Sequence, residues 1–200
     1  MKIGFTYDLR SIQRPDENSP ADYYGEFETE ATIEFIEKAL TELGHDVTKI
    51  GNIQSLLQFL ANGNMVDLVF NMAEGRQGRA REAQVPGVLE AYNIAYTFSD
   101  AFSLTICLDK ALTKQLLRAA NIPTPNYLVL PMGKPIDAVV TSRLGWPIFL
   151  KPVAEGTSKG IDDKAIVHTQ AALSERVTWL WETYQQPVLA ESYLPGREFT

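Results

Sequence analysis

Apolar and polar positions along the first hundred residues predict strands and helices in turn. Short β-rich runs predict strands at 2–7, 47–50, 68–70 and 94–97. Longer stretches with apolar residues three and four positions apart predict helices at 29–43, 53–60 and 84–92. Strands that alternate with helices are typical of a parallel sheet covered by helices. The predicted fold class of this part is therefore α/β, with a Rossmann-like domain built on a parallel sheet.

The helix predicted at 29–43 has recognisable ends. Thr29 is a candidate N-cap, because its hydroxyl can accept a hydrogen bond from a free N–H of the first turn. Gly44 follows the last apolar residue, as is common after a helix C-terminus. The predicted buried face comprises Phe35, Ile36, Ala39, Leu40 and Leu43.

The second half of the chain has a different order of elements. Strands are predicted at 127–130, 147–150, 165–167 and 188–193, interrupted by single helices at 108–120 and 173–181. This order favours an α+β domain with a partly antiparallel sheet. We place the end of the first domain near 99–103, so that residues 1–103 form it. One face of the helix at 108–120 is predicted to carry Leu108, Leu112, Leu116 and Ala120.

Composition and charge narrow the classes of function. The 200 residues are 45% hydrophobic and 22% charged, which describes a globular chain. A net charge of -7 opposes a sequence-independent grip on nucleic acid. The chain has neither a signal-peptide pattern nor an apolar run of membrane-spanning length, so we expect a cytoplasmic protein without a membrane partner. One cysteine and two histidines leave no internal disulfide and almost no ligands for a zinc site.

Residues 151–160 are a candidate phosphate-binding loop. The P-loop and dinucleotide-binding glycine motifs are absent from the sequence, which disfavours P-loop ATPases and dinucleotide oxidoreductases. In the segment 151–160, Lys151 stands at the end of the strand predicted at 147–150. Two residues with hydroxyl groups, Thr157 and Ser158, precede Gly160. Backbone N–H groups and side chains of such a loop can wrap a polyphosphate. A surface hairpin with an incidental lysine fits the residues as well.

A second candidate is the lysine at the start of the helix predicted at 108–120. Lys110 lies in the first turn, where the helix dipole disfavours a cation by about 0.3 to 1 kcal/mol, so that a bound anion would reverse the penalty. Asp109 partly offsets that penalty, and a solvated lysine remains the alternative.

The strand at 188–193 carries a third candidate, because it places Glu191 among apolar residues, where a carboxylate needs a partner. The carboxylate can accept from an exocyclic amine of a base, the backbone around Tyr193 and Leu194 can bind an adenine edge, and Glu198 can take ribose hydroxyls. An ion pair between Glu191 and a lysine or arginine is the alternative.

Four motifs together resemble the D-alanine–D-alanine ligases and their ATP-grasp relatives. They are V-F-N-M-A-E-G at 69–75, L-D-K-A-L-T-K at 108–114, P-I-F-L-K-P-V-A-E-G-T-S-K-G at 147–160 and V-L-A-E-S-Y-L-P-G-R-E-F-T at 188–200. The resemblance implies an ATP-dependent carboxylate–amine ligase that works through an acyl phosphate and uses ATP and Mg²⁺. It also implies a central ATP-grasp subdomain at 104–187, the start of a C-terminal subdomain at 188–200, small amino-acid-like substrates and a homodimer.

The resemblance also implies roles for individual residues. It assigns Lys110 and Lys151 to the ATP phosphates, Thr157, Ser158 and Gly160 to the loop over them, Glu191, Tyr193 and Leu194 to adenine, and Glu198 to the ribose. The family's metal-binding residues, and an arginine that steadies the transferred phosphate, are expected beyond Thr200, so we expect this chain to be inactive alone. A non-catalytic nucleotide- or metabolite-binding module is the main alternative, and a Rossmann-like oxidoreductase or transferase is a third.

Two departures from the family pattern concern the acyl substrate. The family's Gly-rich turn after the first strand is replaced by residues 7–10 and a longer polar insert. The family's usual histidine is replaced by Glu74, which exchanges a titratable cation for an anion. We therefore expect a substrate other than D-alanine, with Glu74 as one candidate contact. Candidates to receive a substrate carboxylate are Arg79, together with Arg76 and Arg81.

Overall fold

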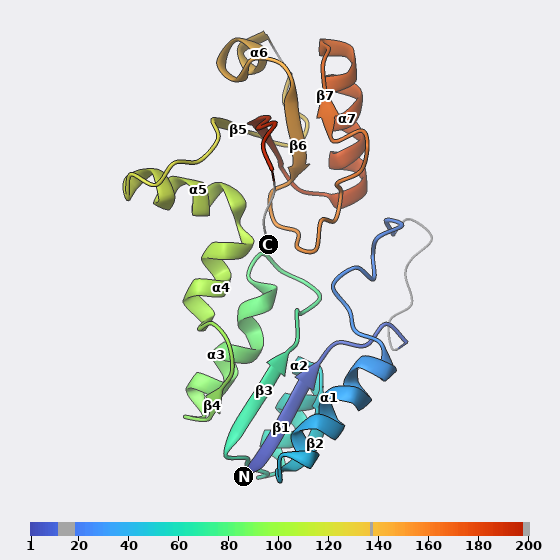
Figure 1. Ribbon diagram of the computed structural model, residues 1–200, viewed down its shortest axis with the longest axis vertical. Coiled ribbons are helices and arrows are strands. Elements are labelled where there is room, and N and C mark those ends of the chain that lie inside the picture. Colours follow the sequence, from blue (N-terminus) through green and yellow to red (C-terminus); the bar gives the residue numbers. More distant parts are fainter. Residues whose placement is uncertain (12–18, 137, 198–200) are drawn as a thin grey trace. The chain divides into compact units, whose positions relative to one another are not determined.

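The structure, a computed structural model, describes residues 1–11, 19–136 and 138–197. The chain forms two compact units, each with its own four-stranded sheet (Figure 1). The first unit comprises Met1–Asp16 and Glu26–Cys107, and the second comprises Glu17–Gly25 and Leu108–Thr200. A short segment from near the N-terminus therefore belongs to the second unit. The predicted division at 103/104 and 187/188 stays a prediction.

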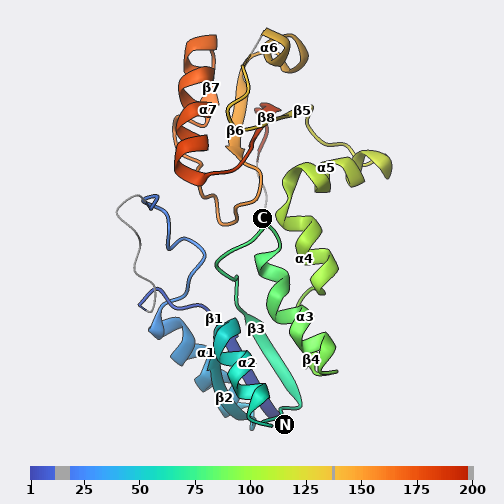
Figure 2. The same cartoon turned by 180° about the vertical axis from the view of Figure 1, so that it is seen from behind.

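The first unit is built on a parallel sheet, as predicted. Its strands are β1 (Lys2–Tyr7), β2 (Asp46–Gly51), β3 (Leu68–Met72) and β4 (Ala95–Tyr96). Their order is β2-β1-β3-β4, and each neighbouring pair is parallel. The helices of this part are α1 (Glu30–Glu42), α2 (Ile53–Ala61), α3 (Gln84–Ala91) and α4 (Ala101–Leu108), with a 3-10 turn η1 (Arg81–Ala83) before α3. Figure 2 shows α2 in front of the strands.

The predicted ends of α1 are confirmed, but its predicted buried face is only partly right. Thr29 caps the helix by accepting a hydrogen bond from the backbone N–H of Thr32 at 3.2 Å. The buried residue of the helix is Ile33, whereas Phe35 and Leu43 are each 73% exposed. The helix contacts β2, which lies at the edge of the sheet. An edge position covers a narrower stripe of the helix than the sequence pattern suggested.

The second unit is built on an antiparallel sheet, which confirms the predicted α+β part. Its strands are β5 (Tyr127–Leu130), β6 (Ile148–Pro152), β7 (Ile166–Val167) and β8 (Val188–Ser192). Their order is β5-β8-β6-β7, so that β8 and β6 lie in the middle. The helices are α5 (Lys110–Ala119), α6 (Ala138–Leu144) and α7 (Gln170–Tyr184).

One predicted helix is in fact two. The helix expected at 108–120 begins at Lys110, because Asp109 is extended and caps α5 by accepting from the N–H of Leu112 at 2.9 Å. Leu108 instead ends the separate helix α4. The predicted apolar face is only partly right. Leu108 is 4% exposed, but the buried residues of α5 are Ala111 and Lys114, and Leu116 is 47% exposed.

The core of the second unit lies between α7 and one face of its sheet. Ile148 and Leu150 of β6 alternate toward α7 and are fully buried. Residues of α7 that pack there are Leu173, Val177 and Leu180. No helix in the described part of the chain is long and apolar enough to cross a bilayer.

Candidate nucleotide site

The pleat of β6 and β8 places two predicted site residues on the face of the sheet opposite α7. In the antiparallel register, Lys151 pairs with Leu189 and Phe149 pairs with Glu191. Lys151 and Glu191 are therefore diagonal neighbours on one face, within reach of long side chains. Helix α5 lies on this face, since its Ala111 packs in a small cluster with Leu189 and Val153.

Glu191 is 5% exposed and forms ion pairs with two lysines. Its Oε2 lies 2.6 Å from Nζ of Lys151, and its Oε1 is paired with Nζ of Lys114. The alternative of an ion pair for Glu191 is therefore realised, with two partners. A buried carboxylate without a cation would be strongly unfavourable, so the pairing explains its burial. Two ammonium groups around one carboxylate leave one excess positive charge at this face.

Lys114 is the partner that the sequence reasoning missed. It is 8% exposed, and its Nζ also donates to Oγ1 of Thr124 at 2.7 Å. Its position four residues after Lys110 puts both lysines on one face of α5, and both lie in the motif at 108–114. That spacing was the available signal, but nothing local predicts the burial of a lysine.

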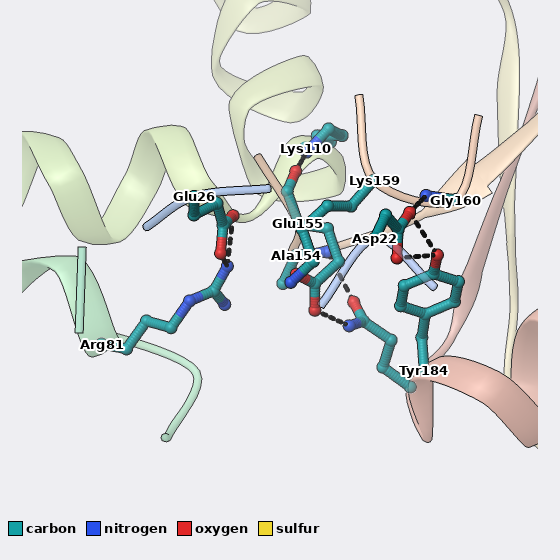
Figure 3. A network of polar contacts seen from close by, with 10 residues as sticks. Asp22, Glu26, Arg81, Lys110, Ala154, Glu155, Lys159, Gly160 and Tyr184 are labelled. Carbon is teal, nitrogen blue, oxygen red and sulfur yellow. Dashed lines mark hydrogen bonds and ion pairs between the residues drawn. The ribbon is translucent and has the colours of Figure 1, made fainter. Parts of the chain in front are cut away.

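Lys110 connects α5 to the loop that follows β6. Its backbone N–H donates to the carbonyl of Val153 at 3.1 Å, and its Nζ donates to the carbonyl of Glu155. The ammonium group at the helix start is thus held against the candidate phosphate loop (Figure 3). Because Asp109 caps the same helix, the first turn has an acid beside the cation, as its sequence suggested.

The candidate phosphate loop at 151–160 has an exposed tip, and hydrogen bonds hold the residues that precede the tip. Thr157 and Ser158 are exposed and have φ angles of 46° and 57°, in the left-handed region that non-glycine residues rarely adopt. Below them, Gln186 accepts from the N–H of Ala154 and donates to Oε1 of Glu155, both at 2.7 Å. The two hydroxyl residues therefore sit on a braced loop with their side chains in solvent.

Of the three residues predicted for adenine, Glu191 lies in β8, and Tyr193 and Leu194 follow its end. Tyr193 is 37% exposed and Leu194 is 63% exposed, and the N–H of Tyr193 donates to the carbonyl of Pro147 at 3.2 Å. The structure thus brings Lys110, Lys151 and Glu191 to one region of the second unit, with Tyr193 and Leu194 continuing the strand that carries Glu191. Glu198 lies outside the described residues.

In the first unit, a group of carboxylates gathers at the ends of β1 and β3. Asp8 follows β1, is 2% exposed, and accepts from the N–H of Gly75 at 2.9 Å. Burial raises the pKa of Asp8 above its ordinary value. Burial, followed by the charges of Glu82 and Glu26, raises the pKa of Glu74 from 4.5 to about 7. The residue in the histidine's place is thus a carboxyl group that titrates near neutral pH.

The three arginines weighed for a substrate carboxylate differ in burial. Arg81 is 8% exposed, and its Nη2 donates to both carboxylate oxygens of Glu26, at 2.9 and 3.1 Å (Figure 3). Its charge is thus engaged inside the unit. Arg76 and Arg79 lie in the exposed loop after β3.

Metal ligands do not gather in the described ranges. Within residues 1–11, 19–136 and 138–197, no three histidine, cysteine or acidic side chains are grouped so that they could hold a metal ion. The described residues therefore do not fit a magnesium site by themselves.

Comparisons with known proteins agree with the motifs. No family model matches the chain. It is 33% identical over 164 residues to the D-alanine–D-alanine ligase of Xanthomonas axonopodis pv. citri, covering 81% of this chain and 50% of that protein. It is 34% identical over 167 residues to the uncharacterized protein y4sG of Sinorhizobium fredii, covering 80% and 48%. The chain thus spans about half the length of these curated relatives.

The fold comparison gives the same result. The crystal structure of D-alanine–D-alanine ligase from Bacillus anthracis complexed with ATP superposes with a TM-score of 0.74 at 21% identity, covering 98% of this chain and 60% of that one. The predicted fold, an α/β domain followed by an α+β ATP-grasp part, is confirmed. The resemblance to the D-alanine–D-alanine ligase family is likewise confirmed, by sequence and by fold.

Proposed function

Because the chain is similar to D-alanine–D-alanine ligases in sequence and in fold, we propose that its second unit binds ATP for an ATP-dependent carboxylate–amine ligase. The observation that carries this proposal is the cationic face around Glu191, where Lys151 and Lys114 leave one positive charge in excess. Lys110 is a third lysine, held at the loop that follows β6.

The lysines of this face divide two tasks between them. An ammonium group has three donors, so Lys151 can donate to a phosphate oxygen without leaving Glu191. Lys114 shares the neutralisation of the carboxylate, so that Lys151 can also serve the nucleotide. Lys110 reaches the phosphates from the helix start, and the hydroxyls of Thr157 and Ser158 cover them from the loop tip.

The adenine base and the ribose of ATP are proposed to bind at the end of β8. A carboxylate offers about four lone-pair positions, so Glu191 can accept from the exocyclic amine of adenine in addition to its two lysines. Tyr193 and Leu194, which are partly exposed, supply the backbone and the surface for the adenine edge. Glu198 is proposed for the ribose hydroxyls.

The chemistry proposed for the whole enzyme is acyl activation. The γ-phosphate of ATP passes to a carboxylate, an amine attacks the resulting acyl phosphate, and ADP and phosphate leave. The contribution of this chain is to position the nucleotide and to neutralise its charge. The dependence on Mg²⁺, the homodimer and the cytoplasmic location stay predictions.

The acyl substrate is proposed to be a small amino acid other than D-alanine. Glu74 replaces the family's histidine with an acid, which changes the sign of the charge that a substrate would meet. Arg79 and Arg76, exposed in the same loop, are the candidates to receive the substrate carboxylate. Arg81 is buried and donates to both carboxylate oxygens of Glu26.

Isothermal titration of the chain with ATP tests the nucleotide proposal, with NAD and GTP as comparators. We expect ATP to bind at least about tenfold more tightly than either comparator, a difference of about 1.4 kcal/mol. Tighter binding of NAD would favour the oxidoreductase alternative, and absence of ATP binding would refute the proposal. Phosphate release by the product of the complete gene, assayed over a panel of amino acids, separates a ligase from a module that only binds.

A further inference from the structure

Residues 19–25 lie between β1 and α1 in the sequence but belong to the second unit. The segment is internally ordered by turns, with the N–H of Gly25 donating to the carbonyl of Asp22 at 2.8 Å. The backbone of Gly25 lies against the side chain of Lys159, so that a Cβ built there would meet Cγ of Lys159 at 3.3 Å. The longer polar insert therefore ends as a packed piece of the candidate nucleotide unit.

Asp22 is the polar anchor of this segment. Its Oδ2 accepts from the backbone N–H of Gly160 at 2.8 Å, at the end of the candidate phosphate loop. The hydroxyl of Tyr184 lies 2.8 Å from Oδ1 and 2.7 Å from Oδ2 (Figure 3). One carboxylate, 138 positions away from Gly160 in the sequence, thus ties the end of the loop to the last residue of α7.

The other polar group of Gly160 is held from a different side. Nη2 of Arg176 donates to the carbonyl of Gly160 at 2.9 Å, and Nη1 of the same side chain donates to Asp162 at 3.0 Å. The guanidinium also stacks 4.1 Å from the ring centre of Trp179. Both hydrogen-bonding groups of the Gly160 backbone are therefore fixed by side chains, one from α7 and one from the insert.

The atoms around Gly160 leave no room for a side chain at this position. Its φ is +72°, and a Cβ built on it would lie 2.7 Å from Cδ of Pro152 and 3.1 Å from the ring of Tyr184. The loop end is wedged between the last residue of β6 and the end of α7. Gln186 braces the beginning of the same loop through Ala154 and Glu155. The exposed Thr157 and Ser158 lie between these two anchors.

The hydrogen bond between Tyr184 and Asp22 has a fixed direction, with the hydroxyl as donor and the carboxylate as acceptor. Burial, together with the hydrogen bond to Asp22, raises the pKa of Tyr184 above its ordinary value, so its hydroxyl keeps the proton that it donates. The carboxylate of Asp22 is satisfied by two donors on its inner side. Asp22 therefore connects the Gly160 end of the loop to the end of α7.

We propose that Asp22 is a positioning residue for nucleotide binding, which holds the Gly160 end of the loop so that Thr157 and Ser158 can cover the ATP phosphates. This inference rests on the proposed function, because it concerns the same loop. It assigns a role to the insert that distinguishes this chain from the family pattern. The insert supplies the second anchor of a loop that Gln186 secures at one end.

The test compares Asp22→Ala with the exposed control Asp163→Ala and with Tyr184→Phe, which removes a single hydroxyl and keeps the ring against Gly160. Titration with ATP and with adenosine gives the nucleotide affinities, and amide hydrogen exchange of residues 154–161 in the unliganded chain reports the loop. If the loop without its anchor is in the binding conformation a tenth of the time, ATP affinity falls about tenfold. Adenosine affinity stays within about twofold, because adenosine has no phosphates for the loop to cover.

We expect Asp22→Ala to speed exchange across the loop and weaken ATP binding, Tyr184→Phe to do so less, and Asp163→Ala to do neither. Equal losses for ATP and adenosine would overturn the inference, since Asp22 would then support the unit rather than the loop. Unchanged exchange, or unchanged ATP affinity, would overturn it as well. If Asp22→Ala does not fold, Asp22→Asn and Tyr184→Phe decide the question. Failure of the unaltered chain to bind ATP would instead refute the proposed function, and the exchange data would still decide whether Asp22 holds the loop.

Discussion

Replacing Lys151 by methionine tests the division of labour between the two lysines around Glu191. Methionine keeps most of the apolar stem and removes only the ammonium group. Glu191 stays paired with Lys114 in this variant, so the buried carboxylate is never left without a cation. Lys114→Met is the matched control, because it leaves the pair between Lys151 and Glu191 in place.

The size of the expected effect follows from the burial of the contact. The side chain of Lys151 is 19% exposed, so a phosphate bound there makes a charge-assisted hydrogen bond in a partly desolvated place. Such bonds contribute about 1.5 to 3 kcal/mol, which corresponds to about a tenfold to 150-fold loss of affinity. We expect this loss for ATP and ADP in Lys151→Met, and little change for adenosine, which lacks phosphates.

Lys114→Met is expected to act on folding and, more weakly than Lys151→Met, on ATP binding. Its ammonium group serves Glu191 and Thr124, so its loss should lower the free energy of unfolding. It also removes the excess charge of the face, so the ATP affinity should fall, but by less than in Lys151→Met, which loses the direct phosphate contact as well. Titration calorimetry and urea unfolding of both variants provide the measurements. The reasoning is refuted if Lys151→Met binds ATP as tightly as the unaltered chain, or if Lys114→Met loses more ATP affinity than Lys151→Met does.

Two further predictions concern the first unit. The pKa of Glu74 is raised from 4.5 to about 7, so the folded chain holds a proton that the unfolded chain releases, and stability should fall as pH rises through that window. Glu74→Gln should remove this fall, as measured by urea unfolding at about pH 5 and about pH 7.5; an identical pH dependence in the variant would contradict the assignment. Gly75→Ala would place a Cβ 2.4 Å from the carbonyl oxygen of Arg81 at a φ of +72°, and should destabilise the unit by about 1 to 3 kcal/mol. The exposed Gly63, with nothing within 4 Å of its Cβ position and a similar φ of +77°, is the control that isolates the clash, and equal losses at both positions would contradict it.

Local patterns predicted most elements because those elements are determined by neighbouring residues. The predicted cap Thr29 is a short polar side chain at the helix start, and the strands are runs of β-favouring residues. Helix α4 (Ala101–Leu108) was not predicted, because it is apolar on nearly every side and lacks the amphipathic period by which a helix is recognised in a sequence. The buried faces were less predictable, since elements remote in sequence decide whether an apolar residue is covered, and they leave Phe35 and Leu116 exposed.

In the candidate site, too, the individual residues could be predicted from local sequence, whereas their arrangement in space could not. Lys110, Lys151 and Glu191 were found because they stand in recognisable motifs, and each motif is local. Their grouping depends on the register between β6 and β8 and on the packing of Ala111, which no window of sequence contains. The role proposed for Asp22 could not be predicted from the sequence, because its partners Gly160 and Tyr184 come close to it only in the folded chain.

The two interpretations of Glu191, as an ion-pair partner or as an adenine acceptor, turn out to be compatible. Its pairing with two lysines explains why a carboxylate can be buried in the middle of a sheet at all. The same two lysines make the surroundings cationic instead of anionic, which a polyphosphate requires. A single lysine would have neutralised the carboxylate and left no charge for the ligand. The two buried ion pairs of Glu191, which first suggest a purely structural role, are therefore also compatible with the nucleotide binding that we propose for this face.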